Sequence, residues 1–335
     1  MLEVTKYNYA GINNLPTTNP INFKAESSLE RSGKTDEIVL EKPKKKKKSL
    51  GKIFAGIIGV VILTYGSIVL RRKLSKPSFD EIQKCFSQIF EKDLSTDEVK
   101  NLISKYKEIC KTKDTDDFVE KMIAELKKDY GLENVTTNTK VNKLKDNSIK
   151  TAMERVKAGS ANPYGQIDMN PGTYNNTLIR STQGETFGTA FHEMFHLKQF
   201  YQAYKADPEL FAKSVYANTK KTAPDEIEKA INQTIELNKK NGITVSRAEA
   251  EKLVEEGSIK EIRQTLDKTY NTTTRFAKDS KEYSKGVEYM NSYENYTSLE
   301  ENMDDYMKNK LEEEAYKVSD NAEKIYKYLS SIWKL

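Results

Sequence analysis

The sequence predicts an α+β fold that is mostly helical and contains a small sheet. Apolar residues recur at three- and four-residue spacing through most of the chain after residue 77, which is the spacing of a helix face. One short extended run, Gln166 to Asn170, lies between two turn signals and indicates a strand. We therefore expect helices to build most of the core and strands to add a minor part.

The beginning of the chain differs in composition from the rest. Residues 1–41 are rich in Asn, Thr, Ser and Lys without apolar periodicity, which predicts a disordered tail. Residues 42–76 contain an uncharged apolar run, Ile53 to Leu70, whose length approaches the ~20 residues of a membrane-spanning helix. Lysines and arginines flank the run, with more before it than after it. This bias predicts a single-pass membrane protein whose amino terminus is cytoplasmic and whose later domains are extracytoplasmic.

The distribution of charge argues against nucleic acid as a partner. The formal net charge is +5, but the basic excess lies in residues 1–76, and residues 77–335 carry a small acidic excess. Basic groups beside an apolar run fit anionic lipid head groups, and the chain has no glycine-rich phosphate loop. The partners expected for this region are membrane lipids, with no nucleic acid.

Residues 77–134 are predicted to form a helical, membrane-proximal module or stalk. Apolar residues mark three helices, and Ser95 with Glu98 forms a capping box for the second. Both cysteines lie on the first two of these helices. Cys85 and Cys110 are expected either to be bridged or to be two buried free thiols.

The two histidines of the chain stand four residues apart, in the motif H-E-x-x-H. On a helix, His192 and His196 share one face, so both imidazoles can reach one metal ion while Glu193 borders the open coordination position. Zinc lowers the pKa of a bound water toward about 7, and a nearby carboxylate can take its proton. The motif therefore predicts zinc-dependent hydrolysis of a peptide or amide bond, with Glu193 as general base.

The residues around the motif predict a buried helix that carries it. Thr182 and Glu185 form a capping box upstream, apolar side chains wrap the segment, and Asp207 with Pro208 ends it. The chain resembles here the zincin metallopeptidases, in which such a helix follows a small sheet whose edge strand aligns the substrate. The resemblance covers residues 135–335. It implies a zincin-like domain, with a helical insertion at about 209–280, that acts on a peptide or protein substrate.

Two histidines leave a zinc ion short of its usual three protein ligands, so the third must be a carboxylate or a cysteine. Gln199 and Gln202 stand where the metzincin branch has a glycine and a third histidine, which excludes that branch. The gluzincin branch takes a glutamate from a later helix, often in the pattern E-x-x-A, and with Ala315 as the small residue this implies Glu312. The alternatives are the two residues that follow it, Glu313 and Glu314.

Enzymes of this kind usually add a tyrosine or a histidine that donates a hydrogen bond to the oxyanion of the reaction. No histidine remains, and Tyr306, just before the glutamates, is the candidate. The chain departs from the gluzincin pattern at Tyr316, where many relatives carry an aspartate that orients a zinc histidine. The other tyrosines nearby are Tyr283, Tyr289, Tyr293 and Tyr296.

The function predicted from the sequence is thus that of a membrane-anchored zinc metallopeptidase. An alternative from a different class is a catalytically inactive, membrane-tethered helical interaction protein in which the motif is a structural or vestigial metal site. Metal binding and cleavage measured on variants of His192 and Glu193 separate the two.

Overall fold

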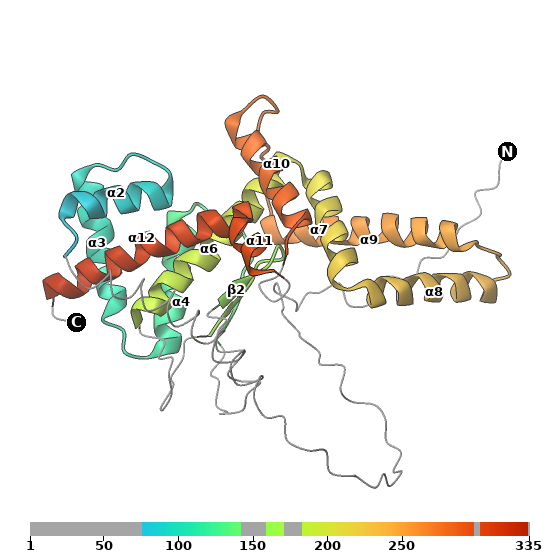
Figure 1. Ribbon diagram of the computed structural model, residues 1–335, viewed down its shortest axis with the longest axis horizontal. Coiled ribbons are helices and arrows are strands. Elements are labelled where there is room, and N and C mark those ends of the chain that lie inside the picture. Colours follow the sequence, from blue (N-terminus) through green and yellow to red (C-terminus); the bar gives the residue numbers. More distant parts are fainter. Residues whose placement is uncertain (1–75, 142–158, 171–182, 298–301, 334–335) are drawn as a thin grey trace, which may run out of the picture. The chain divides into compact units, whose positions relative to one another are not determined.

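The computed structural model describes residues 76–141, 159–170, 183–297 and 302–333, and it is mostly helical with one small sheet, as the sequence predicts (Figure 1). The helices are α2 (Phe79–Phe90), α3 (Thr96–Cys110), α4 (Thr115–Asp129), α6 (Gln183–Ala206), α7 (Pro208–Thr222), α8 (Pro224–Lys240), α9 (Arg247–Tyr270), α10 (Lys281–Glu294), α11 (Met303–Lys308) and α12 (Lys310–Trp333). The strands are β1 (Asn138–Val141), β2 (Gly159–Ala161) and β3 (Gln166–Met169).

The starts of several helices are set by side chains that accept hydrogen bonds from the first free backbone N–H groups. Ser95 and Glu98 form the expected capping box of α3. Ser246 and Glu249 form a second capping box, at the start of α9. Asp207 follows the last residue of α6 and caps α7, so the predicted end of the motif helix is confirmed.

The three strands form a single sheet in the order β1-β3-β2. The central strand β3 confirms the strand predicted from the sequence, and it runs parallel to β1 and antiparallel to β2. A tight turn joins β2 to β3 at Gly165, which has a φ of 78°. A Cβ at this position would lie 2.2 Å from the carbonyl oxygen of Thr136, so the turn requires glycine.

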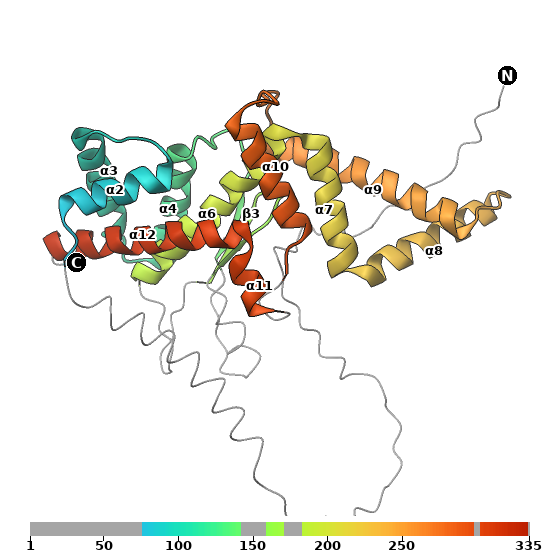
Figure 2. The ribbon, with the colours of Figure 1, turned by 45° about the horizontal axis from the view of Figure 1, so that its top comes forward.

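Helix α6 is central to the core. Apolar residues surround it, which is the pattern of a helix buried inside a domain. It contacts α12, α10, α4 and β2, and Figures 1 and 2 both show α12 running alongside it. Gly184 permits this close approach, since a Cβ there would lie 2.7 Å from the ring of Tyr326. Thr182, the expected N-cap of α6, lies outside the described residues.

Helices α2, α3 and α4, which the sequence assigned to a module before the sheet, share the core of residues 78–335. Helix α2 contacts α12, and α4 contacts α6. The ring of Tyr106 on α3 meets that of Phe187 on α6 edge-on, with the ring centres 5.7 Å apart. Cys85 and Cys110 are both buried free thiols, which is one of the two arrangements that the sequence left open.

The expected fold class is wrong in one respect, because it included a membrane-spanning helix. No helix in the described part of the chain is both long enough and apolar enough to cross a bilayer. Helices α6, α9 and α12 reach 24 residues each, but charged side chains are spread along them. The run from Ile53 to Leu70 and the tail before it lie outside the described residues. The single-pass localisation, with its cytoplasmic amino terminus, depended on that helix and is corrected with it.

Candidate metal centre

His192 and His196 on α6 face Glu312 on α12, and each carboxylate oxygen approaches a different ring. Glu312 Oε2 lies 3.4 Å from Nε2 of His192, and Oε1 lies 3.4 Å from Nε2 of His196. The two Nε2 atoms are 3.0 Å apart. One ligand atom from each residue lies within 4.8 Å of the other two, so this group can hold a metal ion. The structure thus brings together the three candidate ligands that the sequence nominated.

The chemistry of these donors suits a divalent metal ion. Two imidazoles and one carboxylate are a donor set of known catalytic zinc sites, which leave a fourth position for water or substrate. The side chains of His196 and Glu312 are 4% and 2% exposed, whereas that of His192 is 12% exposed. The ring of His192 is therefore the ligand nearest to solvent.

The buried carboxylate of Glu312 also favours a positive charge between the three residues. Burial alone raises the pKa of Glu312, but the two neighbouring histidines outweigh it and hold that pKa well below its usual range. Burial alone lowers the pKa of His196, but the carboxylate of Glu312 outweighs it and raises the pKa to about 9. A buried carboxylate needs a cationic partner, which a proton on His196 or a metal ion can supply.

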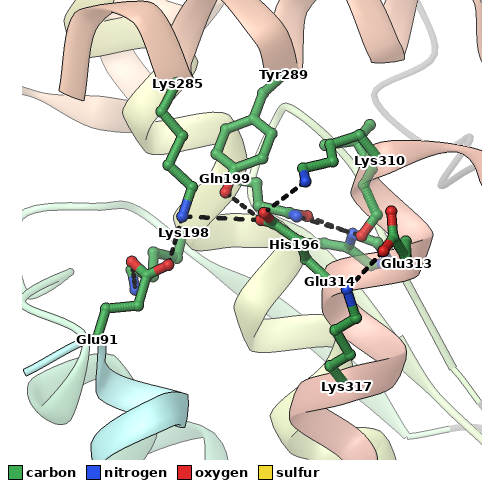
Figure 3. Close-up of polar contacts among 11 residues, drawn as sticks. Glu91, His196, Lys198, Gln199, Lys285, Tyr289, Lys310, Glu313, Glu314 and Lys317 are labelled. Atoms are coloured by element: carbon green, nitrogen blue, oxygen red, sulfur yellow. Dashed lines mark hydrogen bonds and ion pairs between the residues drawn. The ribbon is translucent and has the colours of Figure 1, made fainter. Parts of the chain in front are cut away.

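Gln199 holds the second histidine. Its Oε1 lies 2.9 Å from Nδ1 of His196, and its Nε2 donates to the carbonyl oxygen of Leu311 over 3.2 Å. Gln199 is fully buried, and it lies next to His196 among polar side chains from α6, α10 and α12 (Figure 3). One amide therefore contacts both helices that carry the candidate ligands.

Two tyrosine hydroxyls hold the carboxylate. Tyr306 on α11 donates to Glu312 Oε2, and Tyr296, just after α10, donates to Glu312 Oε1, both over 2.8 Å. Burial raises the pKa of each of these tyrosines, and the nearby Glu312 carboxylate raises it further, so both hydroxyls stay protonated and can donate. The sequence placed Tyr306 beside the site, and its role toward an oxyanion remains a prediction.

Tyr316 lies at the outer edge of the site. Its ring meets that of His192 edge-on, with the ring centres 4.9 Å apart. Tyr316 is 38% exposed. At this position the gluzincin pattern expects an aspartate, and the structure has an aromatic contact on His192 instead.

Glu193, the expected general base, lies on the sheet side of α6. It is 5% exposed, and its charge acts on His196. Gly159, the first residue of β2, packs directly against it. The carboxylate is therefore close to the candidate metal ligand His196 and to the edge strand β2.

The two alternative ligands point elsewhere. Glu313 pairs with Lys317 on the exposed face of α12, and Glu314 accepts a hydrogen bond from Tyr289 and pairs with Lys310 (Figure 3). Among the residues that the structure describes, the group that can hold a metal contains Glu312 and neither of these.

Sequence reasoning missed three contacts of the site: Gln199 as a partner of His196, Tyr296 as a partner of Glu312, and Gly159 as the neighbour of Glu193. Gln199 was noticed only as a departure from the metzincin pattern. Its place three residues after His196, on the same helix face, was the one available signal. Tyr296 was among the tyrosines named near the site, but nothing in the sequence marked its contact with Glu312 or the contact of Gly159 with Glu193, because both form through long-range packing.

No protein-family model matches the chain, and comparisons with curated proteins and with solved structures find no match. The likeness to zincins therefore remains an interpretation of the motif and its surroundings.

Proposed function

We propose that this protein is a zinc-dependent metallopeptidase. The proposal rests on three side chains of metal-binding type that come from two helices far apart in the sequence. One ligand atom of each lies within 4.8 Å of the other two. Glu193, the glutamate of the motif, stands beside this group with its carboxylate buried. A metal-binding group next to a buried carboxylate is the arrangement that hydrolysis by activated water requires.

In this proposal, His192, His196 and Glu312 hold the zinc ion, which when bound supplies a Lewis acid and an acidified water. Glu193 accepts a proton on its carboxylate and returns it to the leaving amine. The hydroxyls of Tyr296 and Tyr306 keep both oxygens of Glu312 in place. Substrate approaches past His192 and Tyr316, the more exposed members of the group.

The test uses the full chain, loaded with zinc and offered a mixed library of quenched-fluorescent peptides. We expect one zinc ion per chain and cleavage that a chelator abolishes. Glu193→Gln should lose cleavage by at least 100-fold while keeping the metal, because general-base catalysis contributes ~10²–10⁴-fold. Glu185→Gln, on the exposed first turn of the same helix, is the matched control and should keep both properties.

The alternative is a metal site without hydrolytic activity. The small exposed fractions of His196 and Glu312 favour it, since a peptide substrate can reach the group only past the side chain of His192. Stoichiometric zinc in a chain that cleaves no peptide of the library would support this alternative and contradict the peptidase. Absence of zinc binding would contradict both.

A further inference from the structure

The side chain of Gln199 connects the two helices that carry the candidate metal ligands. It projects from α6 one turn after His196, toward the first turn of α12. Its carbonyl oxygen lies 2.9 Å from Nδ1 of His196, and its NH₂ group donates to the carbonyl oxygen of Leu311 over 3.2 Å. Leu311 is the residue immediately before Glu312.

The oxygen end of the amide decides which nitrogen of His196 carries a hydrogen. An amide oxygen only accepts, so His196 must donate to it from Nδ1, and in the neutral ring that binds a metal the lone pair is then on Nε2. Nε2 is the atom that faces the other ligands, at 3.0 Å from Nε2 of His192 and 3.4 Å from Glu312. Gln199 therefore selects the form of the ring that can bind a metal at the centre of the group.

The nitrogen end of the amide acts on the other helix. Leu311 and Glu312 belong to the first turn of α12, which starts at Lys310. A hydrogen bond to the carbonyl of Leu311 fixes how far along α6 this turn sits. The position of the Glu312 carboxylate relative to His196 then depends on the same side chain that sets the ring of His196.

We propose that Gln199 is a positioning residue that sets the metal affinity of this site, by holding the ring of His196 with one end of its amide and the helix of Glu312 with the other. The inference rests on the proposed zinc site. Partners behind metal-binding histidines typically change metal affinity by ~10–100-fold when they are removed. Gln199 differs from such partners in that it contacts one ligand directly and, on the other helix, the backbone of the residue before a second ligand.

The experiment measures the zinc dissociation constant of the full chain by competition with a chelator of known affinity. Gln199→Met keeps the length of the side chain and removes both hydrogen bonds, and we expect zinc binding ~10–100-fold weaker than in the unmodified chain. Gln202→Met is the matched control, because the Oε1 atom of Gln202 is buried without a hydrogen-bond partner among the described residues. The control should change affinity by less than about twofold, since no bond is lost.

Gln199→Glu separates the two ends of the amide. A carboxylate still accepts from Nδ1 of His196 but cannot donate to Leu311, so this variant should recover part of the affinity that Gln199→Met loses. The Co²⁺ absorption spectrum should shift in Gln199→Met and stay unchanged in Gln202→Met, because it reports the geometry of the ligands. A substitution that only loosens the core would lower the thermal midpoint of the metal-free chain and leave the spectrum unchanged.

Wild-type zinc affinity in a folded Gln199→Met chain would overturn the inference while leaving the proposed function intact. A Gln199→Glu chain that binds zinc no better than Gln199→Met would overturn the role of the His196 contact. If Gln199→Met does not fold, Gln199→Glu carries the comparison with the unmodified chain, and equal affinities would again overturn the inference. Failure of the unmodified chain to bind zinc would contradict the proposed function, and this inference with it.

Discussion

Gly159 of β2 lies against Glu193 of α6 so closely that no side chain fits between them. A Cβ on residue 159 would lie 2.9 Å from both Cγ and Oε1 of Glu193, and 2.8 Å from Cγ2 of Thr189. The first residue of the edge strand therefore helps to fix the position of the expected general base.

The contact predicts the effect of Gly159→Ala. The added methyl group must displace the Glu193 carboxylate, which is the movable side, so peptide hydrolysis should fall by at least ~10-fold because proton transfer depends on geometry. Zinc content should stay at the wild-type level, since the atoms nearest to the added methyl group belong to Glu193 and Thr189, neither of which is a candidate metal ligand. Ser160→Ala, which adds no atom to the neighbouring position of β2, should retain activity. Loss of zinc in Gly159→Ala would show that the strand supports the metal ligands rather than the base.

The tyrosine pair on Glu312 gives a second prediction. Tyr296→Phe and Tyr306→Phe each remove one hydroxyl from the carboxylate, and each should weaken zinc binding by ~10-fold, the lower end of the range for such partners. Peptide hydrolysis at saturating zinc then tests the oxyanion role predicted for Tyr306. If Tyr306 acts on the substrate, Tyr306→Phe should lower kcat well beyond Tyr296→Phe. Equal kcat values in the two variants would restrict Tyr306 to holding Glu312.

A third prediction concerns the packing of α6 on α12. Gly184→Ala would place its Cβ 2.7 Å from the ring of Tyr326, and a rigid ring cannot move aside as a flexible side chain can. The free energy of unfolding, measured by urea denaturation, should fall by ~1–3 kcal/mol. In a Tyr326→Ala background the same substitution should have a much smaller effect, because the ring is gone. Additive effects of the two substitutions would show that this contact does not limit the packing.

Zinc should stabilise the folded chain, since the ligands come from two separate helices and the site forms only on folding. At a free zinc concentration of 100 times the dissociation constant, the gain in unfolding free energy is about 2.7 kcal/mol. The thermal midpoint should therefore rise on adding zinc to the metal-free chain, and Glu312→Ala should abolish most of the rise. A Glu312→Ala chain stabilised by zinc as strongly as the unmodified one would remove Glu312 from the site.

The sequence predicted the local parts of this structure well. The capping box of α3 and the end of α6 at Asp207 depend on residues close together in the chain, where side-chain chemistry decides the outcome. The same is true of the strand β3 between its turn signals. Glu312 was predicted from the E-x-x-A pattern. In that pattern the small residue, here Ala315, lets the helix that carries the glutamate approach the motif helix closely.

What the sequence could not supply depends on contacts between distant segments. Gly159 contacts Glu193 only because β2 pairs with β3 and packs on α6. The residues around Gly159 in the sequence do not indicate this contact. Tyr296 reaches Glu312 through the packing of the segment after α10. The prediction of a membrane-spanning helix was wrong for a different reason. It used only the length and hydropathy of one segment and considered no packing partner. No described helix meets both criteria.

The most direct measurement is the zinc content of the purified full chain and of three variants, determined after dialysis against a small excess of zinc. The account predicts one zinc ion per chain in the unmodified protein, strongly reduced zinc in His192→Ala and Glu312→Ala, and undiminished zinc in Glu314→Ala, whose carboxylate contacts Tyr289 and Lys310 instead. Zinc that persists in both His192→Ala and Glu312→Ala, or that never binds the unmodified chain, would contradict it.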